Sequence, residues 1–235
     1  TSADGGPVEW LLGLYYLDEN AFQSTLINRD PTFGAAKTIE PLHDVNSKSS
    51  AVFGQFSIQP DDTLKLTAGF RTTNDEKDAV GGTKVQIRPP CGGSFCWVNV
   101  GSQSYSPEDS WSSGTYRLGI DKYINDDRMV YASMSTGYRA GGFNFGVSSA
   151  ESYDPEELTA FEIGSKNRFN DGRMQLNATV FYYDYTDMQV FQVVDQTIVI
   201  RNASEADISG AELEFVAALS DNLRVDASLG LLDAE

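Results

Sequence analysis

The stretch LTAFEIGSKNRFNDGRMQLNATVFYYDY, Leu158–Tyr185, indicates the fold that we expect for the whole chain. Apolar side chains occupy every second position from Met174 to Tyr182, and polar side chains fill the positions between them as far as Thr179. This period of two predicts a strand with one apolar and one polar face. The preceding turn, Phe169–Gly172, contains Asn, Asp and Gly, which readily adopt the positive φ angles of a tight hairpin. We therefore expect two long antiparallel strands joined by a short turn.

The same unit recurs along the rest of the chain. The segments that alternate in this way run approximately over Val8–Asp18, Ser50–Ile58, Leu64–Arg71, Trp111–Tyr123, Arg128–Tyr138, Leu158–Arg168, Met174–Tyr185, Asp207–Leu219 and Leu223–Leu231. Short turns alternate strictly with long irregular stretches, which we expect to be loops and which cover Glu19–Asn46, Thr73–Asp109, Ala140–Pro155 and Thr186–Glu205. Within the last loop, the β-forming composition of Met188–Val194 and Thr197–Ile200 is compatible with a further hairpin.

This pattern predicts an all-β fold, an antiparallel up-and-down transmembrane β-barrel. In a meander, the alternation of connections places every long loop at one end and every short turn at the other. Strands of about ten residues, short periplasmic turns, long outer loops and one apolar face are typical of outer-membrane barrels. Aromatic residues such as Trp10, Phe70 and Tyr116 lie at the ends of the apolar faces, as in interfacial girdles. An odd number of antiparallel strands cannot close, so we expect about nine strands of a larger barrel.

Composition argues against several classes of function. The 235 residues carry a formal net charge of −17, which disfavours a nucleic-acid partner because phosphate binding needs a basic surface. One His and two Cys leave little for metal or thiol chemistry, and no nucleophile–base pair can be assembled from them. We therefore expect no metal, no cofactor, no catalytic residues and no enzymatic activity. No apolar run approaches the roughly 20 residues of a membrane helix.

Several strings in register resemble the barrel of TonB-dependent outer-membrane receptors. They are YASMSTGYRAGGFN (Tyr131–Asn144), YDPEELTAFEIGSKNRF (Tyr153–Phe169), LNATVFYYDYTDMQV (Leu176–Val190) and RNASEADISGAELEF (Arg201–Phe215). VEWLLGLYY (Val8–Tyr16) and LKLTAGFRTTNDEKD (Leu64–Asp78) look like earlier barrel strands of the same family. The resemblance implies a large barrel with an N-terminal plug domain in the outer membrane of a Gram-negative bacterium. It also implies import of a scarce nutrient, such as an iron chelate, with energy passed from the inner membrane by TonB.

The sequence departs from the family pattern by omission. No plug domain or TonB-contacting segment precedes Thr1, no closing strand with a terminal aromatic residue follows Glu235, and no signal-peptide pattern is present. We therefore interpret residues 1–235 as part of a single β-barrel domain, an internal segment that lacks the plug domain and the closing strands. Its expected partners are outer-membrane lipid, a small-molecule ligand, and the TonB complex through the absent plug region.

Two cysteines lie close together in the second long loop. Cys91 and Cys96 flank a Gly-Gly pair, and at an oxidising cell surface they are expected to form a disulfide that staples the loop. A metal site would need further ligands nearby, and His43 lies in a different loop. We interpret His43 as a solvated loop residue.

The glycine-rich string Gly137–Asn144 has two interpretations. It follows a strand but enters no helix, so the context of a phosphate-binding loop is missing. Its glycines can simply shape the strand end and the loop. Alternatively, Arg139, Phe143 and Asn144 contact a ligand at the outer mouth of the barrel.

Two functions from different classes follow. The first is an outer-membrane active-transport receptor, whose strands separate lipid from a polar lumen and whose outer loops bind the ligand. The second is a soluble β-sandwich or barrel that acts as a surface-binding or adhesive module. In the second case the apolar faces form a core, since alternation is also found in soluble antiparallel sheets. The identity of a ligand does not follow from the fold.

Overall fold

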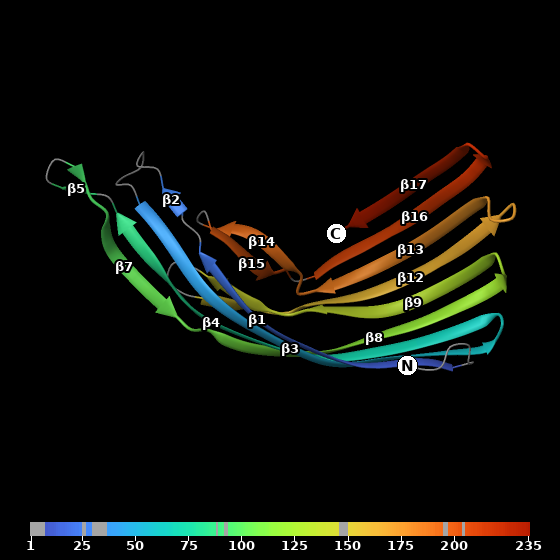
Figure 1. Ribbon diagram of the computed structural model, residues 1–235, viewed down its shortest axis with the longest axis horizontal. Helices are drawn as coiled ribbons and strands as arrows, with labels where there is room; N and C mark the ends of the chain where they lie inside the picture. Colours follow the sequence, from blue (N-terminus) through green and yellow to red (C-terminus); the bar gives the residue numbers. More distant parts are fainter. Residues whose placement is uncertain are drawn as a thin grey trace.

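The computed structural model describes residues 8–24, 27–29, 37–87, 89–91, 94–145, 150–194, 197–203 and 205–235. Its main feature is one antiparallel sheet with the strand order β1-β3-β4-β8-β9-β12-β13-β16-β17 (Figure 1). These strands are β1 Val8–Ser24, β3 Lys37–Asp61, β4 Leu64–Ile87, β8 Glu108–Asn125, β9 Arg128–Arg139, β12 Glu156–Phe169, β13 Met174–Thr186, β16 Glu205–Ser220 and β17 Leu223–Ala234. No helix in the described ranges is long and apolar enough to cross a membrane.

Shorter strands lie at the end of the sheet opposite the tight turns, which we call the outer end. They are β2 Ile27–Arg29, β5 Pro90–Cys91, β6 Ser94–Phe95, β7 Val98–Tyr105, β10 Gly142–Phe145, β11 Ala150–Tyr153, β14 Gln189–Val194 and β15 Thr197–Asn202. β2 pairs with β3 and β7 with β4, whereas β5-β6, β10-β11 and β14-β15 form separate hairpins. The hairpin expected within Thr186–Glu205 is therefore confirmed.

The prediction that Glu19–Asn46 and Thr73–Asp109 are loops is wrong over much of their length. β3 and β4 stay paired in register from Ile58 opposite Leu66 to Lys37 opposite Ile87. Beyond the apolar band, both faces of these strands carry mostly polar residues, as in Asn74–Asp78, so their side chains no longer alternate between apolar and polar. The hydrophobic period disappears there while the backbone pairing continues, and periodicity alone cannot detect such a strand.

The pairing register aligns apolar side chains across the whole sheet. One such row is Phe56, Ala68, Leu118, Met134, Phe161 and Tyr182, each directly opposite the next on the neighbouring strand. The neighbouring row is Ile58, Leu66, Ile120, Ala132, Ile163 and Val180. Because side chains alternate between faces along a strand, these rows merge into one apolar face, and the residues between them form a polar face.

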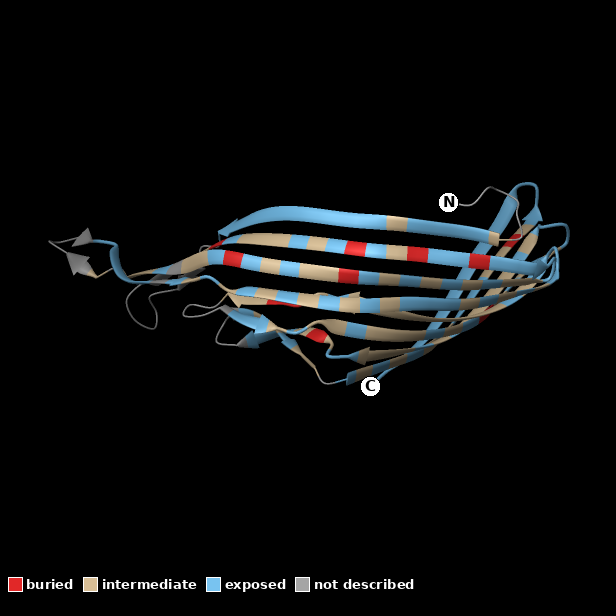
Figure 2. Ribbon diagram, turned by 90° about the horizontal axis from the view of Figure 1, so that it is seen from below, coloured by how far each residue is buried: buried red, intermediate tan, exposed pale blue. Residues whose placement is uncertain are grey.

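No protein layer formed by the described residues covers the apolar face. The buried apolar residues in the described part of the chain are three alanines, Ala51, Ala79 and Ala217. In contrast, Leu12 and Ile163 on the apolar face are 63% and 62% exposed, and Figure 2 shows exposed and less exposed residues alternating along single, uncovered strands. A β-sandwich would bury these side chains between two sheets about 10 Å apart. The sandwich alternative is therefore wrong, and the face needs an apolar medium.

Aromatic rings lie directly over glycines on the polar face. A Cβ atom added to Gly164 would lie 2.6 Å from atoms of the Tyr131 ring on the neighbouring strand. The Tyr131 hydroxyl donates to a Glu162 carboxylate oxygen at 2.6 Å and lies 3.1 Å from the Thr179 hydroxyl. The Lys166 ammonium stands 5.6 Å from the same ring centroid. The ring is thus held flat against the wall, and only glycine leaves room beneath it.

The tight turns have the chemistry that the sequence predicts. Asn170, Asp171 and Gly172 have φ angles of 53°, 53° and 81°, so the turn between β12 and β13 uses left-handed residues. In the turn between β3 and β4, the Asp61 carboxylate accepts hydrogen bonds from the backbone N–H and hydroxyl of Thr63 at 2.7 and 2.6 Å. These turns set the register of the hairpins they join.

We expect Gly164→Ala to destabilise the sheet, because the new methyl group displaces the Tyr131 ring and breaks its hydrogen bonds. Overpacking of this kind costs about 1–3 kcal/mol. Gly230→Ala is the matched control, since Gly230 lies on the polar face with no atom within 4 Å of an added Cβ. Urea unfolding of the full-length receptor in lipid vesicles measures both. Equal stability of the two variants would contradict the packing described for Tyr131.

Leu118→Lys should destabilise the protein by about 2–4 kcal/mol, as a lysine does near the middle of a bilayer. Ser133→Lys, on the neighbouring strand but on the polar face, should have little effect because Glu162 lies opposite it. The same unfolding measurement compares the two. A Leu118→Lys variant as stable as the parent would show that water, not hydrocarbon, covers the apolar face.

Candidate functional site

Two hairpins fold back over the polar face at the outer end. Figure 1 shows β14 and β15 inside the arc of the main sheet, and β10-β11 contacts His43, Lys77 and Trp111. The three residues lie in β3, β4 and β8, respectively. Because the pairing register continues without a shift, alternate residues stay on the same face of the sheet, and these three lie on the polar face. The outer end is therefore where a second layer of protein covers the sheet.

His43 joins the first hairpin to the wall. Its ring stacks on Phe145 of β10 with 4.1 Å between centroids and 18° between planes. Its Nδ1 atom lies 2.8 Å from the Tyr105 hydroxyl of β7. The side chain is only 5% exposed, and this burial lowers the pKa of His43. The interpretation of His43 as a solvated loop residue is therefore wrong, because an aromatic from a distant loop covers it.

Lys77 makes a second contact between the wall and the same hairpin. Its ammonium donates to the Gly141 carbonyl at 2.7 Å and stands 5.7 Å from the Trp111 ring centroid. Burial lowers the pKa of Lys77. A Cβ atom at Gly141 would lie 2.4 Å from the Tyr153 carbonyl oxygen and 2.7 Å from Trp111. The close approach of the chain therefore requires glycine at this position.

Arg139, Phe143 and Asn144 are close in the sequence, but the contacts that the structure gives Phe143 and Asn144 are with different partners. Arg139 is exposed at the end of β9. The Phe143 ring is tilted against Trp111, with centroids 6.4 Å apart. The Asn144 amide donates to the Ile200 carbonyl at 2.7 Å and accepts from the Ile200 N–H at 2.7 Å. The amide of Asn144 is therefore engaged with β15, whereas Arg139 presents an exposed charge. Contact with a ligand stays a prediction for all three.

Sequence reasoning missed two other amides in this region. Gln189 is 7% exposed, and its side-chain N–H₂ donates to the carbonyls of Ala140 and Asp154 at 3.1 and 3.0 Å. Asn202 donates to the Asp154 carbonyl at 2.9 Å, and its oxygen accepts from the Asp154 N–H at 2.9 Å. No local pattern marks either residue, because their partners are distant in the sequence.

The predicted disulfide lies at the tip of the β3-β4 extension. Cys91 in β5 pairs with Ser94 in β6, and the Cys96 N–H donates to the Pro89 carbonyl at 3.2 Å. The side chain of Cys91 lies outside the described residues, so the Cys91–Cys96 bond stays a prediction.

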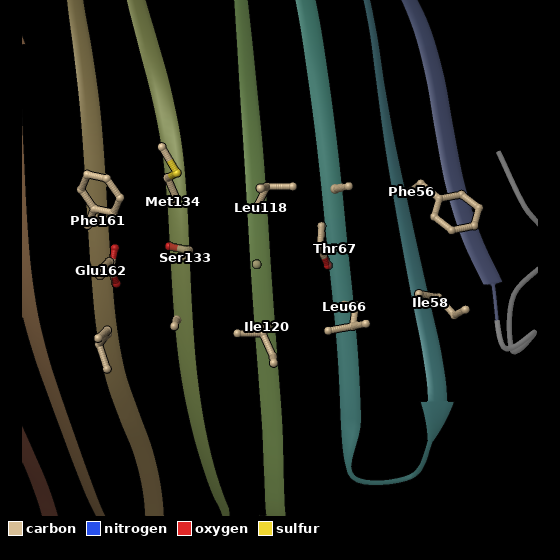
Figure 3. Close-up of a pocket in the computed structure, with 14 residues that line it drawn as sticks. Phe56, Ile58, Leu66, Thr67, Leu118, Ile120, Ser133, Met134, Phe161 and Glu162 are labelled. Atoms are coloured by element: carbon tan, nitrogen blue, oxygen red, sulfur yellow. The ribbon is translucent and has the colours of Figure 1, made fainter.

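A groove of about 570 Å³ crosses the apolar face rather than the polar one. Figure 3 shows one wall with Phe56, Leu118, Met134 and Phe161 and the other with Ile58, Leu66 and Ile120. Thr67, Ser133 and Glu162 come between these walls in the sequence of each strand, but they alternate with the apolar residues and therefore belong to the polar face. The groove lacks the convergent polar groups that fix a polar ligand, so the outer end remains the better candidate site.

Acid should loosen the hairpin that packs on His43. Burial holds the pKa of His43 below the roughly 6.5 of a free side chain. The packing of the hairpin on neutral His43 therefore has its full stability above that pH, and it loses stability as the pH falls and the ring becomes protonated. Hydrogen exchange of β10-β11, corrected for intrinsic rates, should therefore be faster at pH 5.5 than at pH 7.5. A His43→Gln variant should lose this difference. If the variant keeps it, another group controls the hairpin.

Comparison with known proteins places this architecture in a family. Residues 3–234 match the family model "TonB dependent receptor-like, beta-barrel". The chain is 28% identical over 217 residues to the pesticin receptor of Yersinia enterocolitica, which covers 91% of this chain and 29% of that protein. It is 27% identical over 140 residues to the probable TonB-dependent siderophore receptor PiuA of Acinetobacter baumannii, covering 56% of this chain and 18% of that protein. The chain thus spans less than a third of the length of these relatives.

Solved structures share the fold. The ferric yersiniabactin uptake receptor FyuA from Yersinia pestis superposes with a TM-score of 0.79 at 18% identity, over 100% of this chain and 33% of that one. The ferric-catecholate import receptor Fiu from Escherichia coli gives a TM-score of 0.55 at 13% identity, over 95% of this chain and 38% of that one. The chain therefore belongs to the family of TonB-dependent receptors of the Gram-negative outer membrane, as part of their β-barrel.

Proposed function

We propose that the chain forms part of the wall of an outer-membrane receptor that actively takes up a scarce nutrient. The match to the barrel family over residues 3–234 is the observation that carries this proposal. Residues 1–235 are assigned to one β-barrel domain, and the plug domain and the contact with TonB to other parts of the same protein. The chain acts in transport and not in catalysis, as the names of its relatives suggest.

The two faces of the sheet support a wall that separates lipid from a passage. Outer-membrane lipid covers the apolar face, since large apolar side chains on it are exposed in rows. The polar face carries charged groups in the passage, including the 2.9 Å ion pair of Lys65 with Glu9. This division is the one that transmembrane barrels use.

The ligand we propose is a metal chelate of small-molecule size. Curated relatives are named as siderophore and metal-pseudopaline receptors. At the outer end, Arg139 is exposed and offers charge to an anionic chelate. The hairpin β14-β15 adds apolar side chains, with Phe191, Val193 and Ile198 being 72%, 73% and 69% exposed. Charge and apolar surface together suit a ligand that carries both acidic and apolar parts.

Uptake of radioactive iron tests the transport function. Cells that contain the full-length receptor should accumulate iron from at least one of a set of ferric hydroxamate, catecholate and phenolate chelates. Deletion of the receptor gene and deletion of the TonB gene should each abolish that uptake. If uptake from every chelate in the set is unchanged when the receptor gene is deleted, the proposed function is wrong.

Arg139→Ala should weaken binding of the transported chelate about tenfold or more, because hydrogen bonds to charged groups contribute roughly 1.5–3 kcal/mol. Arg173→Ala is the control, since Arg173 is exposed near the tight turns and contacts only the Ala218 carbonyl, at 3.3 Å, among the hydrogen bonds of its side chain in the described residues. Equilibrium binding to the purified receptor measures both. Equal affinities of the two variants would exclude Arg139 from the site.

A further inference from the structure

Two successive outer loops are tied together through side-chain amides. The Asn144 amide pairs with both backbone groups of Ile200 at 2.7 Å, as a neighbouring strand would. This contact joins β10 to β15, two strands that share no backbone ladder. Because both polar atoms of the amide are satisfied by one residue, the relative position of the two hairpins is fixed at this point.

Gln189 holds the base of the same assembly. Its N–H₂ group donates to Ala140, just before β10, and to Asp154, just after β11, at 3.1 and 3.0 Å. Its backbone N–H donates to a Glu156 carboxylate oxygen at 2.6 Å. A side chain from β14 therefore bridges the two ends of the β10-β11 loop. It is buried, so loss of its amide removes this donor from the Ala140 carbonyl, which is costly, whereas the Asp154 carbonyl keeps a second donor.

Asn202 completes the connection from the other strand of the second hairpin. Its amide bonds both the N–H and the carbonyl of Asp154 at 2.9 Å, and it also donates to the Asp187 carbonyl at 2.8 Å. The three amides thus join β10-β11 and β14-β15 at the base and along one side.

The wall beneath this assembly is divided. The ladder between β8 and β9 ends with Arg117 opposite Ser135. Immediately beyond that pair, one side-chain bond still joins the two strands, from the Tyr116 N–H to the Thr136 hydroxyl at 2.9 Å. Further out, β8 continues alongside β4, and β9 continues alongside β12 as far as Arg139. The outer end of the sheet therefore has two sides. The hairpins belong by chain connection to the side formed by β9, β12, β13 and β16.

The assembly contacts the other side through few groups. Among the described residues, the contacts include the 2.7 Å hydrogen bond from Lys77 to Gly141, the packing of Trp111 against Gly141 and Phe143, and the stacking of His43 on Phe145. The Tyr105 ring of β7 also stacks on Phe145, with 5.8 Å between centroids. Separation of the ring contacts leaves no polar group unsatisfied, and loss of the lysine bond affects one carbonyl, that of Gly141. Loss of the amide bonds instead removes partners from several backbone groups, which is more costly.

We propose that Asn144, Gln189 and Asn202 position β10-β11 and β14-β15 as a single unit, which separates from the β3-β4-β8 side at the Lys77 and His43 contacts. In this view a ligand meets one composite surface made by two loops, and both hairpins move together when the outer end opens. The coupling goes beyond the transport function and does not depend on it, because it is measured without a ligand.

Hydrogen exchange on the full-length receptor in detergent tests the coupling. Gln189→Ala, a change in β14, should speed exchange of the β10-β11 amides at least tenfold, and it should leave the β12-β13 ladder unchanged. Asn144→Ala should speed exchange in β14-β15, because coupling between two sites is reciprocal. Gln192→Ala is the matched control, since Gln192 lies on the opposite face of β14 and is exposed.

Lys77→Met tests where the unit separates. Loss of the lysine bond should speed exchange in both hairpins by the same factor, since they open as one body. Heat-modifiable gel mobility confirms that each variant keeps its barrel, and Asn202→Ala replaces Gln189→Ala if the latter does not fold. The proposal is overturned if Gln189→Ala affects β14-β15 alone, or if Lys77→Met loosens one hairpin and not the other.

Discussion

The structure depends on one constraint: a single layer of sheet must satisfy its backbone hydrogen bonds without a protein core. In a bilayer, each backbone N–H and C=O needs a partner within the protein, because hydrocarbon offers none. The in-register ladders from β1 to β17 provide those partners for all but the outer edges of β1 and β17 among the described residues. The apolar rows then need only lipid around them, and the tight turns hold neighbouring strands in the register that aligns those rows. Few residues are buried within the protein because lipid, rather than a protein core, surrounds the apolar side chains.

The same constraint explains why the two ends of the sheet differ. At the end with tight turns, two to four residues reverse the chain, and the described residues form no further strand there. At the outer end, the strands extend beyond the apolar band and are no longer surrounded by lipid. A single layer of sheet there has no lipid to cover one of its faces. Protein therefore covers the polar face instead, through the inward-folded hairpins. Among the buried polar residues described, His43 and Gln189 lie at this end, whereas Ser57 lies near the tight turn between β3 and β4, where its hydroxyl pairs with that of Thr67 at 3.0 Å.

Two kinds of side-chain contact shape the polar face. Aromatic rings lie over glycines within the band, and side-chain amides bond backbone groups beyond it. Within the band, Tyr131 over Gly164 and Phe181 over Gly210 keep the polar face of the wall flat. Beyond it, Asn144 and Gln189 replace missing ladder bonds with side-chain bonds and hold irregular loops in place. The proposed transport role depends on both kinds of contact. A passage needs the smooth wall that the rings provide, and a binding face needs loops that the amides hold in place. Arg139, Phe191 and Val193 are then the exposed groups that such a face offers.

The sequence by itself determined the strands inside the apolar band, their two faces, the tight turns and the alternation of connections. Period-two burial acts on neighbouring residues and is therefore visible locally. The second hairpin of the outer loops was also predictable from composition. Only the tertiary structure decided that β3 and β4 extend far beyond the band, since strands with mostly polar residues on both faces show no hydrophobic period. It also decided the pairing of Asn144 with Ile200, of Gln189 with Ala140 and of His43 with Phe145. These partners lie in different loops, and no local pattern records which loops the folded wall brings together.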